Sequence, residues 1–286
     1  MLPFAKDYNE AYDAKLVTKV CDGSITALNE LLGHHEPFIF NIAVRMLRTE
    51  KRAILFTNTL LVKILLHVRS IPPDCSFRTW LYRMVAVSLI DFDVNNPDEN
   101  GYNFEMLGRQ IDLDTQLPSM SESEEQCFTQ EVNTISQICQ QAALSCLPAS
   151  SRLLFIFQTI FNIPPEEVLK STKQTPGEIT EHIQSNKKQL LALMNKRCSL
   201  IKPGNPCRCN KRAKYYIDNN IHPTSNNLYR NSLTVDQLIS EDSINTEVKD
   251  QLVSIFRNQF FFDSDHRNTL INTISFQKED FTVTDL

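Results

Sequence analysis

The stretch SFRTWLYRMVAVSLIDF, residues 76–92, decides the expected fold. We expect a helix from residue 77 to residue 92, preceded by a loop with two adjacent prolines. Before that loop, residues 54–68 are strongly apolar, which predicts a central buried helix. Residues 13–93 are therefore expected to form a set of packed helices.

Two helix boundaries are predicted upstream of this stretch. Ser24 has the side chain of an N-cap residue and precedes an apolar stripe, so we expect a helix to begin there. The run HHEP at residues 34–37 predicts a break. Its two adjacent histidines are interpreted as a helix-end feature rather than a metal site.

The composition of the whole chain favours helices. Of 286 residues, 42% are hydrophobic and 22% are charged, as in an ordinary soluble protein. Only six glycines occur, although strand-rich folds and phosphate-cradling loops both depend on glycine. We expect an all-α fold: two helical domains joined by an acidic flexible linker, the second domain a helix-turn-helix, and a small helical C-terminal extension.

The sequence carries no membrane or secretory signal. No run of eighteen apolar residues occurs, and the first ten residues, MLPFAKDYNE, lack the pattern of a secretory signal. The eight cysteines are scattered rather than spaced as a disulfide framework, so we expect free thiols in a reducing compartment. The expectation is a cytoplasmic protein without membrane insertion.

Charge is unevenly distributed, although the net charge is only −5. Residues 96–141 contain nine acidic side chains and a single basic one, Arg109, whereas residues 187–214 contain nine basic side chains and no acidic one. This segregation predicts an acidic linker and a basic face able to neutralise phosphates. The alternative is that the basic stretch is the solvated, lysine-rich end of a helix.

Periodicity divides the chain into four parts. Residues 1–95 form the first helical domain, and residues 96–130 lose helical periodicity, which predicts the flexible linker. Residues 131–196 contain a short helix, a turn and a longer helix, the layout of a helix-turn-helix. Residues 197–286 combine a basic cysteine-containing segment with a small amphipathic unit, whose apolar run at residues 260–262 needs a surface to cover it.

Several segments resemble the extracytoplasmic-function sigma factors of bacterial RNA polymerase. Residues 22–40 and 76–83 (SFRTWLYR) resemble sigma region 2, and the second of these is the most specific match. The residues LP at 147–148, Arg152 and PEEV at 165–168 resemble sigma region 4. The cysteine-containing segment that follows resembles an extension found in some members. The two region-like parts, with the linker between them, cover about two thirds of the chain.

The resemblance implies a transcription initiation factor that binds core RNA polymerase and promoter DNA. The first domain would hold the melted −10 element, and the helix-turn-helix would read the −35 element in duplex DNA. An anti-sigma factor or another regulatory protein is a further partner consistent with it. The implied polymerase-binding residues are Asn58, Thr59 and Lys63. The implied DNA-binding residues are Arg78, Trp80, Arg83, Thr175, Thr180, His182, Gln184, Ser185, Lys187 and Lys188.

Some of these residues also have a purely structural interpretation. Trp80, the only tryptophan, lies beside Arg78 and Arg83 and suits stacking on a single strand, but we favour a core anchor between helices for Trp80 itself. The helix after Gly177 is alternatively a plain amphipathic helix.

The chain departs from the family pattern at two places. The polymerase-binding helix of family members carries several carboxylates, whereas residues 52–60 (RAILFTNTL) carry none. The basic residues expected after Asp91 are also absent. A second hypothesis therefore stays open: a degenerate sigma-like adaptor or regulator that acts through protein–protein contacts without productive promoter binding.

Neither catalysis nor a cofactor is expected. The sequence has no phosphate-loop, dinucleotide-binding or His-Glu-x-x-His motif, so we predict no enzyme activity. Cys198, Cys207 and Cys209 lie within twelve residues, and we interpret them as buried or loop residues. The alternative is a zinc or redox site, with zinc held by these three thiolates and a histidine such as His222.

Overall fold

Ser24 and Thr49 begin the two helices on which the rest of the fold is assembled. Each hydroxyl accepts a hydrogen bond from the backbone N–H three residues later, at 3.2 and 3.4 Å, and so satisfies a free donor of the first helical turn. The helices are α2 (Ile25–Leu47) and α3 (Glu50–His67), which pack against each other. The predicted helix start at Ser24 is confirmed.

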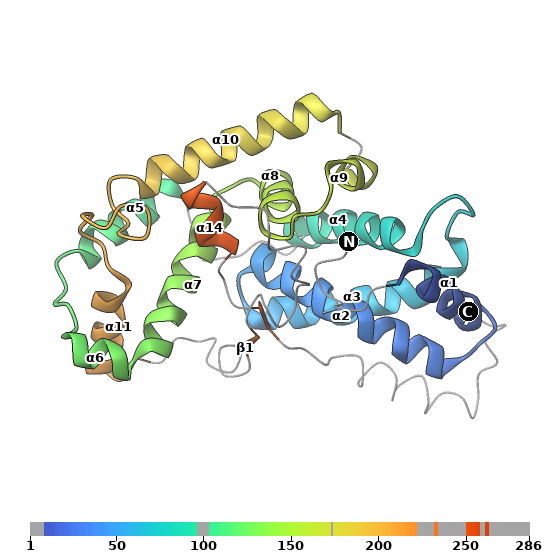
Figure 1. Ribbon diagram of the computed structural model, residues 1–286, viewed down its shortest axis with the longest axis horizontal. Helices are drawn as coiled ribbons and strands as arrows, with labels where there is room; N and C mark the ends of the chain where they lie inside the picture. The colour runs from blue at the N-terminus through green and yellow to red at the C-terminus, as the bar shows by residue number, and fades with distance from the viewer. Residues whose placement is uncertain are drawn as a thin grey trace.

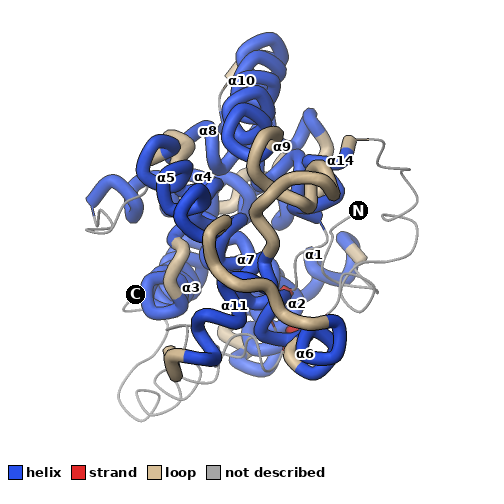
Figure 2. The backbone as a smooth tube through the Cα atoms, turned by 90° about the vertical axis from the view of Figure 1, so that its left-hand side faces the viewer, coloured by secondary structure: helices blue, strands red, loops and turns tan. Residues whose placement is uncertain are grey.

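The computed structural model describes residues 9–95, 103–172, 174–221, 232–233, 250–257 and 261–262. These residues are almost entirely helical, which confirms the all-α fold (Figures 1 and 2). The remaining helical elements of the first part are α1 (Glu10–Cys21), η1 (Val68–Ser70) and α4 (Phe77–Asn95). Those that follow are α5 (Phe104–Asp114), α6 (Glu122–Cys127), α7 (Thr129–Ser145), α8 (Ala149–Phe155), the π-helical turn η2 (Ile156–Ile160), α9 (Pro165–Thr172), α10 (Pro176–Met194), α11 (Cys209–Asp218) and α14 (Gln251–Arg257). The described strands, β1 (Ser232–Leu233) and β2 (Phe261–Phe262), form one short antiparallel pair.

Helix α2 does not break at the HHEP run, where the sequence predicted a break. Pro37 lies inside the helix, and the turns on both sides of it are helical. A proline inside a helix removes a backbone hydrogen bond and costs about 3 kcal/mol. Both flanking turns are buried, with Leu32 and Phe38 at most 1% exposed. Burial of the helix on both sides of the proline therefore overrides the local break signal.

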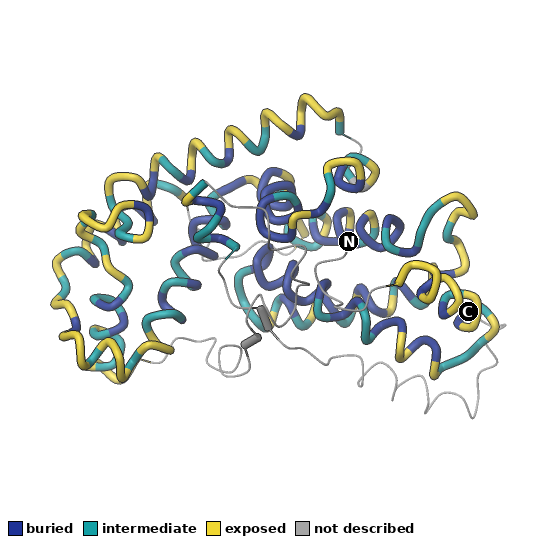
Figure 3. Tube along the Cα trace, viewed as in Figure 1, coloured by how far each residue is buried: buried dark blue, intermediate teal, exposed yellow. Residues whose placement is uncertain are grey.

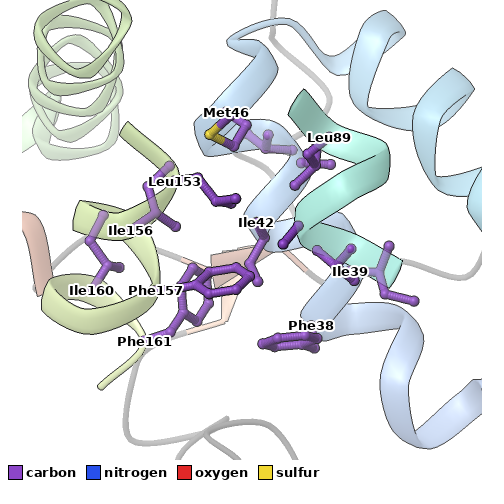
Figure 4. Close-up of a cluster of buried hydrophobic side chains, with 14 of the residues drawn as sticks. Phe38, Ile39, Ile42, Met46, Leu89, Leu153, Ile156, Phe157, Ile160 and Phe161 are labelled. Carbon is purple, nitrogen blue, oxygen red and sulfur yellow. The ribbon is translucent and has the colours of Figure 1, made fainter. Parts of the chain in front are cut away.

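The larger of two hydrophobic clusters among the described residues runs through both of the predicted domains (Figures 3 and 4). Phe38 and Ile42 of α2 face Phe157 and Phe161 from the segment after α8, and all four side chains are at most 1% exposed. The ring centroids of Phe38 and Phe161 lie 6.0 Å apart. The apolar side chains of each half are thus buried against those of the other half.

The prediction of a flexible linker is wrong for residues 103–127. The Asn103 side chain caps α5, and Ser121 opens α6 with a capping box. Leu107 and Ile111, one helical turn apart, are buried in the core. The acidic composition of the segment concealed this short apolar stripe.

The C-terminal extension contains a short helix that packs on the second half of the chain. Phe256 of α14 lies against Phe155 of α8, with ring centroids 5.4 Å apart. Strand β2 contacts α2, so the described part of the apolar run at residues 260–262 lies near the central helices. The parts of the predicted linker and extension that lie outside the described residues are 96–102, 222–231, 234–249, 258–260 and 263–286.

One described segment, Glu50–Ser70, is long and apolar enough to cross a membrane. It comprises α3 and η1. Leu60, Leu61 and Ile64 of this segment are buried against other helices of the fold. A core helix of a soluble protein passes the same test of length and composition.

A buried carboxylate–histidine cluster joins α1 to α2. Asp13 is 1% exposed, and its carboxylate bonds to the buried His35 and, at 3.0 Å, to His34. Burial lowers the pKa of His35, although the neighbouring Asp13 opposes this shift. Burial also raises the pKa of Asp13, but the hydrogen bonds from both histidines outweigh it and lower the pKa. The histidine pair therefore lies inside α2 and links this helix to α1; it does not mark a helix end.

We predict that His35 destabilises the fold as the pH falls from 7 to 5. Its pKa is lower in the folded chain than in the unfolded chain, so the unfolded chain binds the proton first. Its contribution to the free energy of unfolding therefore decreases below about pH 6.5, by at most about 1.4 kcal/mol per pH unit. Urea unfolding at pH 7, 6 and 5 measures the effect.

The matched variants are His35→Asn and His34→Asn. His35→Asn is expected to flatten the pH dependence between pH 7 and 5, whereas His34→Asn, at a position 33% exposed, is expected to retain it. An unchanged pH profile in His35→Asn contradicts the assignment of this effect to His35.

Candidate nucleic-acid interface

Helix α10 has a well-defined start and a fixed inner face. Thr175 and Glu178 form a capping box, and Pro176 occupies the first helical position. The hydrogen bonds from Thr175, first from its backbone and then from its hydroxyl, lower the pKa of Glu178. On the inner face, the Asn186 side chain donates to the Ser151 carbonyl of α8 at 2.7 Å. These contacts fix α10 on α8.

The outer face of α10 is open to solvent over most of its length (Figure 3). Gln184, Ser185 and Lys188 are exposed on this helix. An amide and a hydroxyl can bond base edges, and an ammonium can meet phosphates. Glu181 is exposed as well, so negative charge lies nearer the start of the helix.

Three other predicted DNA-binding residues make local contacts. The Thr175 hydroxyl donates to the Glu178 carboxylate within the capping box. The Thr180 hydroxyl donates to a backbone carbonyl one turn earlier, at 2.9 Å. His182 is half-buried, with Nδ1 3.2 Å from the hydroxyl of Ser151. These side chains help to hold α10 in place.

Lys187, also a predicted DNA contact, pairs with the C-terminal segment. Its Nζ lies 2.9 Å from a carboxylate oxygen of Asp250, immediately before α14. The guanidinium of Arg257, at the other end of α14, donates to the Thr159 carbonyl at 2.6 Å. The C-terminal segment is thus fastened to α10 and to η2.

Helix α9 packs on α4 along the SFRTWLYR residues. Trp80 is 8% exposed, and its ring centroid lies 5.7 Å from that of Phe77. In this arrangement it is a core side chain and is not available to stack on a melted DNA strand. Arg78 Nη2 lies 3.8 Å from the Glu167 carboxylate. Arg83 Nε donates to a backbone carbonyl of α9 at 2.8 Å. Both arginines predicted to meet a melted strand therefore contact α9.

Glu167 is the centre of this contact between α4 and α9. It is 7% exposed and accepts hydrogen bonds from the Thr79 hydroxyl and, at 3.3 Å, from Lys170. Burial raises the pKa of Glu167, but the bonds from Thr79 and Lys170 outweigh it and lower the pKa. The carboxylate is therefore charged and held between the two helices.

The predicted polymerase-binding residues lie on α3 among exposed apolar side chains. Thr59 is exposed, Asn58 is half-buried, and Lys63 Nζ lies 3.5 Å from the hydroxyl of a serine on α4. The α3 apolar face is the set of exposed side chains Leu55, Val62 and Leu66. We predicted that this helix is buried and so missed the face. The available signal was that α3 is apolar on more sides than its neighbours can cover.

The acidic and basic segments bind each other. The Arg197 guanidinium makes two hydrogen bonds to the Asp112 carboxylate, at 2.7 and 3.0 Å, and lowers its pKa. Arg212 and Asp114 pair at 3.2 Å, and a third pair joins α6 to α11 at 2.6 Å. Part of the predicted basic face is therefore neutralised within the chain. The basic side chains of this stretch that remain exposed are Lys188, Lys196, Lys202 and Arg208.

Burial raises the pKa of the three clustered cysteines and of a fourth cysteine, which sequence reasoning missed. Cys198 and Cys207 are partners in an isolated parallel β-bridge, and Cys209 opens α11. Burial raises the pKa of the Cys139 thiol of α7, and the thiols of these three cysteines raise it further. Burial raises the pKa of Cys207 to about 12 and that of Cys209 to about 11. Without a metal these groups are neutral thiols.

These thiols do not form a metal site in the described part of the chain. Among the described residues, no group of three or more His, Cys, Asp and Glu side chains is arranged to hold a metal ion. His222, the predicted fourth ligand, lies outside the described residues.

No protein-family model matches the chain, and no curated protein matches it. We therefore infer function from the side-chain arrangement and from the resemblance of the segments quoted above.

Proposed function

We propose that the protein is a sigma-like transcription initiation factor that binds core RNA polymerase and directs it to promoter DNA. The observation that carries this proposal is α10. It follows α9 after a short turn, rests on α8, and presents Gln184, Ser185 and Lys188 to solvent. It lies at the edge of the molecule in two perpendicular views (Figures 1 and 2). A helix placed in this way can enter the major groove of duplex DNA.

The side chains of α10 suit different parts of the DNA. The Gln184 amide carries a donor and an acceptor, which match the N6 and N7 edge of adenine. Lys188, one turn later, can meet a phosphate. The exposed Glu181 is repelled by phosphates, so we expect residues 184–188, rather than the first turn, to lie closest to the DNA.

Contact with the −10 element requires a change of shape. The −10 and −35 elements are separated by roughly 85 Å of duplex, at 3.4 Å per base pair. In the free chain, however, α4 and α8–α10 belong to one packed body, and Arg78 and Arg83 contact α9. We infer that this is a closed state and that core polymerase separates α9 from α4.

The proposed polymerase contact is apolar rather than acidic. The α3 apolar face exposes Leu55, Val62 and Leu66 by 55%, 41% and 47%, around the predicted contacts Asn58 and Thr59. Burial of these side chains against the polymerase would stabilise the complex without the carboxylates of the family pattern. The proposal places the protein in the cytoplasm, without membrane insertion, cofactor-dependent chemistry or catalysis of its own.

A second candidate is a degenerate sigma-like adaptor that binds protein partners without productive promoter binding. The shared core favours it. Separation of the two halves would expose Phe38, Ile42, Phe157 and Phe161, at about 1.5–3 kcal/mol each, or roughly 6–12 kcal/mol in total. An adaptor avoids this cost, because it can bind polymerase, an anti-sigma factor or another regulatory protein through the α3 apolar face while closed.

Assembly with core RNA polymerase tests the proposal. We predict that the protein co-elutes with core enzyme on gel filtration and that the complex starts transcription only from promoter DNA. Val62→Asp is expected to weaken assembly at least tenfold, because the new carboxylate must be desolvated in an apolar contact.

The matched control is Leu113→Asp, which changes a leucine that is 67% exposed on α5, outside the α3 apolar face. It is expected to assemble normally. Co-elution without initiation favours the adaptor, and failure of the folded wild-type chain to co-elute contradicts the sigma role.

Binding to duplex DNA is predicted to depend on Lys188. The variant Lys188→Ala is expected to reduce the steepness of log affinity against log salt concentration by about 1, because one fewer phosphate is neutralised. Fluorescence anisotropy with labelled duplexes across a salt series measures the slope. Lys51→Ala, an exposed lysine on α3, is the control. Equal slopes for the two variants contradict a phosphate contact of Lys188.

A further inference from the structure

We propose that a cavity between the α2–α3 corner (residues 47–54) and helix α7 binds a short peptide with apolar side chains and free termini. The cavity has a volume of about 640 Å³, and small-molecule pockets commonly measure roughly 300–1,000 Å³. The side chains that line it and enter the argument are Arg48, Glu50, Lys51, Ile54, Ile138 and Gln141. The contacts proposed above with polymerase and DNA use none of them, so the inference does not rest on the transcription function.

The α2–α3 corner is a fixed wall of this cavity. Arg48 joins the two helices with a φ of +67°, and the Thr49 N–H bonds to the Leu47 carbonyl at 2.8 Å, which closes a γ-turn around Arg48. The Arg52 guanidinium donates to the same carbonyl at 3.2 Å. The backbone that carries the charged side chains of the cavity is therefore held in place without a ligand.

Gln141 of α7 carries the hydrogen-bonding capacity of the site. It is 5% exposed, and within the described part of the chain its side-chain amide makes no hydrogen bond. A buried amide without a partner is unfavourable, because it has given up its hydrogen bonds to water. A ligand satisfies this amide only if it offers a donor and an acceptor together. A peptide group does so with its N–H and its C=O.

The charged side chains of the cavity suit the two ends of a peptide. Arg48 and Lys51 can bind a carboxylate. Glu50 is half-buried and has no ion-pair partner among the described residues, and burial raises its pKa. An ammonium group beside Glu50 would favour the charged carboxylate and offset this effect.

The apolar side chains of the cavity favour a peptide over simpler ligands. Ile54 and Ile138 are both half-buried and line the cavity, so they offer apolar surface to the side chains of a ligand. An inorganic anion would use only the cations. A fatty acid would use the cations and the isoleucines but would leave Gln141 and Glu50 without partners. A peptide with apolar side chains uses all three kinds of group.

A bound peptide would join the two halves of the chain. Ile54 belongs to the first half, whereas Ile138 and Gln141 belong to the second half. A ligand that contacts both binds the folded chain and not the unfolded chain, so it raises the free energy of unfolding.

Calorimetric titration of the full chain with leucyl-leucine tests the proposal. We expect one binding site per chain. Gln141→Leu is expected to weaken binding by about tenfold or more, because the peptide group then lacks its hydrogen-bond partner. The urea midpoint of this variant is expected to equal or exceed that of the wild-type chain, since the free chain loses no hydrogen bond.

The matched control is Gln140→Leu, at the neighbouring position of α7. Gln140 is 6% exposed, does not line the cavity, and donates to the Ser136 hydroxyl at 2.9 Å. This variant is expected to bind leucyl-leucine normally, whereas its urea midpoint is expected to fall. The two glutamines thus separate loss of binding from loss of stability.

Peptides with blocked ends test the charged contacts. N-acetylation of leucyl-leucine is expected to weaken binding to the wild-type chain by about tenfold but to have little further effect in Glu50→Gln. Amidation of the carboxyl end is expected to behave in the same way with Arg48→Gln.

Three results overturn the proposal. They are the absence of leucyl-leucine binding to the folded wild-type chain at millimolar concentration, unchanged binding in Gln141→Leu, and equal or tighter binding of decanoate, which has a carboxylate and an apolar chain but no peptide group. None of these measurements uses DNA or polymerase, so their failure is distinct from failure of the transcription role.

Discussion

The packing of α2 against α8 and η2 is the constraint on which the rest of the structure depends. Phe38 and Ile42 are buried in the same core as Phe157 and Phe161, so the two halves of the chain share one core. In this shared core α9 packs on α4, which buries Glu167 between them. The two arginines of SFRTWLYR, Arg78 and Arg83, then contact α9. The outer face of α10 stays open because its inner face alone completes the contact with α8. The same packing thus closes one candidate DNA surface and leaves the other accessible.

Charge pairing adds a second layer to this constraint. The acidic and basic stretches form ion pairs such as Arg197 with Asp112, so the segregated charge stabilises the fold before it can serve any partner. Most of these pairs are partly exposed, where a single pair contributes roughly 0.2–1 kcal/mol. Their joint effect is to hold α5 and α6 against α11 and the turn that follows α10. Exposed cations such as Lys188 are what remain for nucleic acid.

Local signals made part of this structure predictable. The all-α fold followed from scarce glycine, and the start of α2 from Ser24. These depend on side chains within a few residues of the backbone that they affect. The predictions of a break at HHEP and of a flexible linker were wrong because distant parts of the chain determine both segments. Burial of Phe38 in the core keeps α2 continuous, and burial of Leu107 keeps α5 helical.

Long-range contacts made the rest unpredictable from one sequence. Trp80 was correctly favoured as a core side chain, but no local pattern shows that Glu167, almost ninety residues away, binds beside it. The equal numbers of acidic and basic residues in the two charged stretches were a usable hint of mutual pairing.

The distance between the two halves should be measured in the free chain and in a complex with core polymerase and promoter DNA, because it reports whether the shared core opens. Labels carried by noncanonical amino acids at Lys15 of α1 and Gln189 of α10, both exposed, avoid the native cysteines. We expect one narrow distance distribution in the free chain and a longer distance in the initiating complex. A broad distribution in the free chain contradicts the shared core, and an unchanged distance in an initiating complex contradicts the opening of α9 from α4.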